Sequence, residues 1–467
     1  MTEVYSRICS ASLIKEATAN VPLTPTNFFH LNEEDIAFEY AYTPAMPVAA
    51  NRVKNLRAVK NKILSGKGTL TVNVDPKTWG HFLNGVFGGV TSGRYLPISG
   101  ANGTFTVGET VTGGTSSATG TVALSSNGEF LLLTSPSGTF TAGETITGGS
   151  SGFTATVTTY SATVYGHVGT LPDSSFITYT LQINLLDSAY RYFGVRFGGL
   201  DAIGQKDNII TAGIKVTAQG QFRHAKVTAI TASGAGTKTL TLDQTLGLVA
   251  GDSIKLYRTG SGFLDFSASS VKTHTVATVA STTTITVTDL QTSTAVGDLI
   301  MLAPQTASYT TGNEFQWIGG SVGYLGAAIA SLAAESLEDF TYIVDTEFED
   351  RHAATGTLMK DRFPSAVLEK GHVGSGTFKA YYNDEDFMRL QRLTTPQAFR
   401  VKSTGDLITG TLYNQIWFTF PAVILEPYQT NLAEDKIIDE DIKFTAFNDT
   451  STGYFTRSVL INDVAAY

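Results

Sequence analysis

The chain has little charge, a single cysteine and few prolines. Charged residues make up 16% of its 467 residues, whereas globular proteins average about 25%. Proline occurs 13 times. One cysteine, Cys9, excludes an internal disulfide framework and a zinc finger built on thiolates. The hydrophobic fraction of 42% is too high for a disordered chain.

Basic residues and long apolar runs are also scarce. The formal net charge is −9, so no bulk electrostatic attraction to nucleic acid or anionic membranes is expected. The first 25 residues contain no apolar run of the kind found in a secretory signal. The longest uncharged stretch of possible membrane interest, 315–334, contains four glycines and is expected to form a packed strand and helix, not a membrane span. Glycine, at 46 residues, and threonine-rich strands are typical of β-rich assembly proteins.

A nearly literal repeat occurs early in the chain. Residues 103–114 recur as residues 138–149, and each copy continues into a run rich in Ser, Thr, Ala and Val. Phe105 and Val122 mark apolar strand positions, and glycines supply the turns. The pattern predicts a small β module over 100–163, made of two related hairpin units.

A looser pair of repeats follows. Residues 238–243 form a Thr-rich alternating strand that leads to a Gly-Asp turn and a second strand at 250–256. Residues 284–289 lead in the same way to 296–302. The pattern predicts a second inserted β module over 226–308, in the form of a small barrel.

A longer-range match indicates duplication. Residues 66–75 match residues 374–383 without a gap, and in both copies a strand runs into a helix start. Asp75 is a suitable N-cap for the first helix. After it, apolar residues with helical spacing predict one buried face, Trp79, Phe82, Leu83, Val86 and Phe87. The later copy places Phe387, Leu390 and Leu393 on a comparable face.

A second block is duplicated in the same order. Residues 207–218 match residues 435–446 at an offset of 228, whereas the first pair of blocks is offset by 308. The module at 100–163 accounts for most of the difference. We therefore predict two copies of one strand–helix–strand domain, the first over 1–99 and 164–225 and the second over 309–467.

The order of these blocks resembles the tail tube proteins of long-tailed bacteriophages. The resemblance covers about two thirds of the chain and is carried by a succession of weak motifs, Lys15-Glu-Ala-Thr18, Pro22-Leu-Thr-Pro25, Phe28-Phe-His-Leu31, the segment 52–82, and the closing strands at 435–447 and 453–462.

This resemblance implies a mainly β fold with few short helices. We expect two β-sandwich or rolled-sheet tube domains and two small all-β insertion modules. In that family, six domains form a ring, rings stack into a hollow tube, and an arm reaches the next ring. Because one chain would supply two domains, we expect a homotrimer with pseudo-sixfold symmetry.

The resemblance also implies a location and partners. The protein is expected in the virion tail, assembled in the bacterial cytoplasm, with the tape measure, tail terminator and distal tail proteins as partners. DNA passes through such a tube without specific binding, so the lumen should be neutral or negative. No membrane contact, catalytic residue, cofactor or metal is expected, and the chain is not expected to be an enzyme.

The candidate sites all have plainer interpretations. The glycines of 319–326 suit a phosphate-binding turn, but Ser321 stands where strict spacing needs glycine, so a strand–helix junction leading into a helix over 327–337 is preferred. Two acidic clusters lack the spacing of a calcium loop and are expected in a loop or helix N-terminus. They are Glu347, Glu349 and Asp350 with His352, and Asp384, Glu385 and Asp386. The seven histidines form no close pair, namely His30, His81, His167, His224, His274, His352 and His372.

One basic cluster precedes the first duplicated strand. It consists of Arg52, Lys54, Arg57, Lys60 and Lys62. A nucleic-acid patch is the alternative, but an inter-subunit arm that pairs with acidic neighbours is favoured.

Two other functions stay open at this point. One is another virion part, such as a capsid or decoration protein. The second is a glycan-binding surface protein, which would expose aromatic residues in the first module. There, the aromatic positions Phe105, Phe130, Phe140 and Phe153 are expected to be buried in strands.

Overall fold

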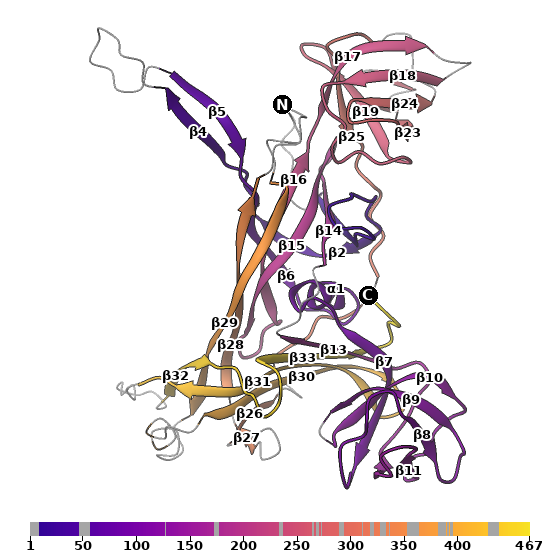
Figure 1. Ribbon diagram of the computed structural model, residues 1–467, viewed down its shortest axis with the longest axis vertical. Coiled ribbons are helices and arrows are strands. Elements are labelled where there is room, and N and C mark those ends of the chain that lie inside the picture. The colour runs from indigo at the N-terminus through magenta and orange to yellow at the C-terminus, as the bar shows by residue number, and fades with distance from the viewer. Residues whose placement is uncertain are drawn as a thin grey trace.

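β-strands form most of the computed structural model (Figure 1), which confirms the mainly β class. The structure describes residues 9–45, 57–126, 128–171, 177–232, 237–263, 266–267, 270–271, 273–288, 294–310, 312–317, 322–326, 333–335, 337–352, 364–381, 389, 392, 396–427 and 439–467. Within these residues, no helix combines the length and apolarity needed to cross a membrane.

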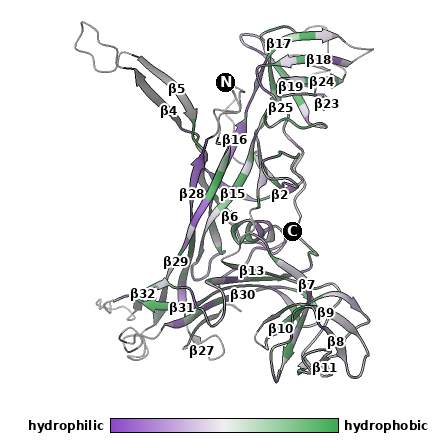
Figure 2. Ribbon diagram, in the orientation of Figure 1, coloured by the Kyte–Doolittle hydropathy of each residue, from purple (hydrophilic) through white to green (hydrophobic). Residues whose placement is uncertain are grey.

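A run of eight antiparallel strands forms the central sheet, whose middle strands lie along the long axis of the molecule (Figure 1). Its spatial order is β3 (Leu31–Glu34), β6 (Gly66–Asn73), β16 (Thr211–Phe222), β15 (Ala189–Gly204), β28 (Leu337–Arg351), β29 (Ala366–Tyr381), β32 (Asp439–Ala446) and β31 (Leu412–Leu425). Hydrophobic and hydrophilic residues alternate along these strands (Figure 2), as expected for a sheet buried on one face.

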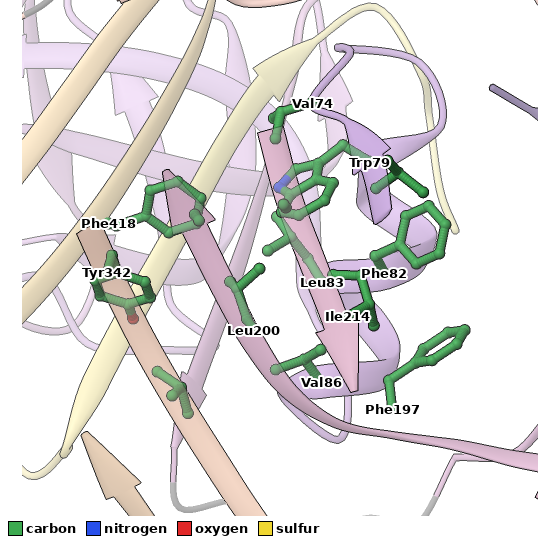
Figure 3. Packing of buried hydrophobic residues seen from close by; sticks show 14 of the residues in the cluster. Val74, Trp79, Phe82, Leu83, Val86, Phe197, Leu200, Ile214, Tyr342 and Phe418 are labelled. Carbon is green, nitrogen blue, oxygen red and sulfur yellow. The ribbon is translucent and has the colours of Figure 1, made fainter. Parts of the chain in front are cut away.

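Helix α1 (Trp79–Val86) covers part of the apolar face of this sheet (Figure 3). Its predicted apolar face is confirmed, because Trp79, Phe82, Leu83, Val86 and Phe87 are all buried. The helix begins three residues later than an Asp75 cap implies. The Asp75 carboxylate nevertheless accepts the backbone N–H groups of Lys77 and Thr78, so it caps the turn that leads into α1.

The same seven-strand arrangement occurs twice in the chain. The first repeat has the spatial order β2 (Asn27–Phe29), β1 (Ser10–Lys15), β14 (Tyr179–Asn184), β15, β16, β6 and β3. The second repeat has the order β27 (Ala333–Glu335), β26 (Val322–Gly326), β30 (Gln397–Thr409), β31, β32, β29 and β28. Corresponding strands also follow one another in the same order along the chain.

The pairing register is the same in both repeats. Leu70 lies opposite Ile214 in the first repeat. The residues that match them in sequence, Phe378 and Ile442, lie opposite each other in the second. The two blocks found in the sequence at different offsets are therefore partners in one ladder. The domain boundaries drawn from the sequence stay a prediction.

An irregularity is repeated as well. In the first repeat the register of β3 on β6 shifts between Leu31 and Glu33. In the second repeat the register of β28 on β29 shifts between Leu337 and Asp339. Because β-bulges redirect a strand in a defined way, their recurrence aligns Leu31 with Leu337 and Glu34 with Phe340.

Six strands close into a small barrel at the lower right of Figure 1, called here the first barrel. The order of pairing around it is β8 (Thr110–Gly113), β9 (Thr119–Ser126), β10 (Phe130–Ser137), β7 (Thr91–Ser99), β12 (Thr154–Val157) and β11 (Thr145–Gly148), which returns to β8. Its interior is a hydrophobic cluster of its own that includes Phe105, Val111 and Val122. Strand β7 lies before the predicted boundary at residue 100.

Six further strands close into a second barrel, at the upper right of Figure 1. Their order is β19 (Ser253–Arg258), β23 (His274–Val279), β24 (Thr284–Thr288), β18 (Thr237–Leu242), β17 (Ala225–Ala232) and β25 (Leu299–Leu302), which returns to β19. A second separate cluster fills it.

The two barrels share one turn, repeated four times. In each turn a glycine with positive φ precedes a carboxylate that accepts the N–H of the residue three positions earlier. The four carboxylates are Glu109, Glu144, Asp252 and Asp298. When these turns are aligned, all six pairings of the first barrel recur in the second. The chain order differs only in that the counterpart of β12 comes first, so the second barrel is a circular permutation of the first.

In the first barrel, the turn carboxylate of each hairpin unit accepts hydrogen bonds from the other unit. Glu109 accepts hydrogen bonds from Ser150 and Ser151, and Glu144 accepts them from Thr115 and Ser116. Burial would raise the pKa of Glu109, but these bonds outweigh it and lower the pKa to about 2. The Glu109 carboxylate is therefore charged at neutral pH and is occupied by hydrogen bonds within the barrel.

Each barrel is fixed to the body by a charged contact. In the second barrel, Asp252 forms an ion pair with Arg191 of β15 at 2.8 Å, and both side chains are 1% exposed. In the first barrel, Glu129 forms an ion pair with Arg400 of β30 at 2.6 Å. Beside it, the ring of Phe130 meets the ring of Trp417 edge-on.

Part of the predicted architecture is wrong. The helix expected over 327–337 is contradicted, because β27 covers Ala333–Glu335 and β28 begins at Leu337. Sheet pairing with β26 overrides the helical preference of an alanine-rich segment. The strand–helix junction is likewise replaced by an antiparallel β26–β27 pair. Residues 319–321 of the glycine-rich segment lie outside the described residues.

Two predicted acidic clusters have different outcomes. Glu347, Glu349 and Asp350 lie in β28 and not in a loop or at a helix start. The second cluster, together with the apolar face predicted for the later helix, lies outside the described residues, namely Asp384, Glu385, Asp386, Phe387, Leu390 and Leu393.

Candidate self-association interface

The central sheet has two different outer edges. Among the described strands, β3 pairs with β6 on one side only. At the other edge, the last residues of β31 pair with β32, while β30 leaves β31 at Val423. An open strand edge is a template for another chain, so both edges are candidate interfaces.

The two repeats are joined by a pair of strand edges, and this joint shows how two such edges pair with each other. Strands β15 and β28 pair antiparallel over six positions, from Gly199 opposite Asp345 to Gly204 opposite Phe340. Lys215 of the neighbouring strand β16 adds an ion pair to Asp345 at 2.6 Å. The joint is heterologous, because it brings the β15 edge of one repeat against the β28 edge of the other.

The two outer edges are counterparts of the two strands in this joint. Strand β31 of the second repeat corresponds to β15, and β3 of the first repeat corresponds to β28. An edge of the β15 type is therefore available at one end of the chain's sheet and an edge of the β28 type at the other. This arrangement can repeat head to tail from chain to chain without a new kind of contact.

A hollow of about 570 Å³ lies beside β3. Its wall includes Cys9, Asn32, Glu33, Tyr190 and Tyr309. The ring of Tyr309 stacks on His30, with ring centroids 4.4 Å apart, and His30 also lines the hollow.

A carboxylate with two tyrosines lies beside this hollow. Glu34 accepts hydrogen bonds from the hydroxyl groups of Tyr190 at 3.0 Å and Tyr192 at 2.7 Å. Burial and the nearby Glu34 carboxylate raise the pKa of both tyrosines above the usual range, so they stay protonated donors. Glu34 also accepts the N–H of Ile36, which satisfies a polar group on the β3 segment. The counterparts in the second repeat are Phe340, Phe418 and Phe420.

One face of the central sheet is polar and uncovered. Register places one partly exposed residue from each strand in a row across it, in the order Glu33, Thr71, Gly213, Asp201, Ile343, Ser375, Thr445 and Ile424. The residues next to these in each strand point to the opposite, apolar face, where Leu70, Ile214, Leu200 and Val344 are buried.

Among its described residues, the polar face has no excess of positive charge. Four lysines on it are accompanied by four aspartates and by Glu33, and the paired members are Lys67, Lys215, Lys379, Lys443, Asp201, Asp339, Asp345 and Asp441. Lys379 also forms an ion pair with Glu338 at 3.1 Å. A polyanion on this face would therefore meet hydroxyl groups and paired charges, and not a continuous row of basic side chains.

A two-stranded arm projects from the body at the upper left of Figure 1. It consists of β4 (Tyr40–Ala45) and β5 (Arg57–Ile63) and connects β3 to β6. The predicted basic residues Arg57, Lys60 and Lys62 lie in β5, and Arg52 and Lys54 lie outside the described residues. In the second repeat the equivalent connection is the hairpin formed by the ends of β28 and β29, which carries Glu347, Glu349 and Asp350.

The histidines do not come together as a site. Within the described part of the chain, no group of three His, Cys, Asp or Glu side chains could hold a metal ion. His167 is buried between Ser92 and Asn462, and burial lowers its pKa to about 4 despite the bonds to Asn462 and Val464. Burial lowers the pKa of His81 to about 4 as well. Both therefore act as neutral packing residues at neutral pH.

The aromatic residues of the first barrel are mainly internal. Phe105, Phe130 and Phe140 are at most 3% exposed, and Phe153 is partly buried against the same core. These positions lack the exposed aromatic platform that sugar binding would use.

Sequence reasoning missed the residues that matter most at this interface. Glu34 lies 156 positions from Tyr190 and 158 from Tyr192, and no sequence spacing connects it to them. The alignment of residues 190–192 with 418–420, which only the strand register supplies, would have identified them.

No protein-family model matches the chain, and no curated protein matches it.

Proposed function

We propose that the chain is a structural virion protein that polymerises into the tail tube of a long-tailed phage, the conduit for genome delivery. One observation carries the proposal: the two open edges of the central sheet are counterparts of the two strands that the chain already joins internally. Three chains then close a ring of six repeats, and rings stack into a tube. The tape measure, tail terminator and distal tail proteins are its expected partners in the virion.

Barrel size supports a hollow ring. Each chain contributes eight strands to the central sheet, so three chains contribute about 24 to a closed barrel. Barrels of about 16–18 strands already leave an aqueous channel. Helix α1 and the apolar core lie on one face of the sheet, so the polar face lines the channel.

The polar face suits DNA passage. Each phosphate that a Lys or Arg neutralises adds sequence-independent affinity and therefore drag. On this face lysines are matched by carboxylates, and much of the remaining surface is threonine and serine. The two small barrels lie away from this face, so they decorate the outside of the tube.

The proposal is tested by mass and by electron microscopy of the purified chain. We expect closed rings or stacked tubes with a central channel, and a native mass near three times 49.7 kDa for a single ring. A protein that stays monomeric at high concentration, or a stable ring of six chains, would contradict it.

A charge placed on the polar face should hold DNA in the tube. Thr71→Lys with Thr377→Lys adds unpaired cations to the channel wall, so preformed tubes should shield at least tenfold more short DNA from nuclease in about 50 mM salt. The effect should disappear near 0.5 M salt, because each phosphate contact adds about 0.9 to the salt slope.

The matched control is Thr112→Lys, an exposed residue of the first barrel. DNA attracted to the outer surface stays open to the nuclease, so this variant should shield no more than the unchanged protein. Equal shielding by both variants would place the polar face outside the channel.

A further inference from the structure

We propose that the open edge from β3 to Glu39, with the hollow beside it, is the socket for a neighbouring copy of this chain, which places Glu426, just past the end of its β31, opposite Glu39 in the register that β15 uses on β28. This inference rests on the self-assembly proposed above and names the surfaces that perform it.

The second repeat shows what fills the equivalent place. Beside β28, the indole Nε1 of Trp317 donates to the carbonyl of Glu338 at 2.9 Å. The Trp317 ring lies 4.5 Å from the ring of Phe340. The N–H of Lys206 donates to Asp339 at 2.9 Å. Residues of the first repeat and of the segment between the repeats therefore cover the start of β28.

The counterparts of these covered residues line the hollow. Asn32, Glu33 and Glu34 of β3 correspond to Glu338, Asp339 and Phe340, and all three lie in the wall of the hollow. Within the described residues, the hollow is thus the place where the first repeat has no counterpart of the cover that the second repeat receives.

The end of β31 is the part of a neighbouring chain that can begin a joint along this edge. Val195 lies opposite Ala218 in the first repeat, and Val423 lies opposite Ala446 in the second. Beyond Leu425, the N–H of Glu426 still donates to the carbonyl of Lys443, so the ladder continues. Lys443 matches Lys215, the partner of Gly199. Glu426 therefore occupies the position equivalent to Gly199, the residue at which the joint between β15 and β28 begins.

The register predicts which residues meet across the interface. Gly199 lies opposite Asp345 within the chain. The counterpart of Gly199 is Glu426, and the counterpart of Asp345 is Glu39. Glu426 of one chain should therefore lie opposite Glu39 of the next. Both side chains are exposed in the single chain.

A disulfide tests this pairing, because Cys9 is the only native cysteine. In a Cys9→Ser background, Glu39→Cys with Glu426→Cys should form a disulfide between chains under mild oxidation. Within one chain the two positions lie at opposite edges of the sheet, seven strand spacings of about 4.8 Å apart. A disulfide needs Cα atoms within about 7 Å, so it cannot form inside the chain.

The expected product on a non-reducing gel is a covalent trimer that no longer grows with time, with a linkage between residues 39 and 426 found by mass spectrometry. The control, Glu426→Cys with Thr112→Cys, should stay at monomer mass under the same oxidation. Rings that assemble normally without the expected linkage would overturn this inference while leaving the proposed function standing. Failure of the unchanged chain to assemble would instead remove the proposed function.

One other occupant is an outcome of the same experiment. Residues 1–8 precede Cys9 and lie outside the described residues. If they fill the hollow, Glu3→Cys with Asn32→Cys will form a disulfide within monomers, and the 39–426 linkage will be absent. That result would overturn the proposed socket.

Discussion

Arg191→Met is expected to lower the free energy of unfolding by about 3–5 kcal/mol. The guanidinium group donates to both carboxylate oxygens of Asp252, to the carbonyl of Gly247 and to the side chain of Gln182. Arg191 and Asp252 are each 1% exposed. Methionine keeps much of the volume but leaves the Asp252 carboxylate buried without its cation, which costs more than the ion pair itself contributes.

Chemical denaturation followed by tryptophan fluorescence measures this effect. The matched control is Lys215→Met, which breaks the ion pair with Asp345 between side chains 50% and 40% exposed and should cost less than about 1 kcal/mol. The double variant Arg191→Met with Asp252→Leu should recover part of the loss, because no buried charge remains. Equal losses in Arg191→Met and Lys215→Met would contradict the assignment of a buried ion pair.

Trp79→Ala is expected to cost about 3–5 kcal/mol. Trp79 is 1% exposed and lies in the main hydrophobic cluster, where its ring centroid is 5.8 Å from that of Phe82. Because α1 supports the apolar face of the central sheet near β15, the cavity should also reduce assembly into rings. Urea unfolding and native mass measurement of the same samples report the two effects.

The matched control is Trp79→Phe, which places at this position the residue type of its sequence match, Phe387. It should cost less than about 1.5 kcal/mol. The indole Nε1 of Trp79 is buried and has no hydrogen-bond partner within the described residues, so its removal offsets part of the lost apolar contact. A Phe variant as unstable as the Ala variant would show that the indole shape itself holds α1 in place.

The sequence predicted the parts of the fold whose periodicity is local. The buried face of α1 followed from helical spacing, and the two pairs of duplicated blocks followed from direct comparison. The pairing of those blocks with each other did not follow, because register depends on contacts between residues more than 140 positions apart, as for Leu70 and Ile214. The helix expected over 327–337 failed because β26 pairs with residues 333–335 and β29 pairs with Leu337, and local preference does not include these backbone partners.

The candidate interface was predicted only in outline. An inter-subunit arm was expected at the basic cluster, and the structure places Arg57, Lys60 and Lys62 of that cluster in β5 of the projecting β4–β5 pair. The hollow beside β3 and the Glu34, Tyr190 and Tyr192 cluster had no sequence signal. The relation between the barrels was also missed, because one pair of turns uses glutamate, the other uses aspartate, and the strand order is permuted.

The joint between β15 and β28 has a consequence for the entropy of assembly. Association of two free protein units costs an estimated 4–15 kcal/mol in lost translation and rotation. In a ring of six repeats, each of the three chains makes one joint as it folds, so assembly needs two associations between separate molecules, whereas six separate domains would need five. The inner joints carry Phe340 against Trp317, while the outer edge keeps Glu34 and its tyrosines. The chain thus places its apolar contact at the intramolecular joint and leaves a polar, water-compatible edge at β3.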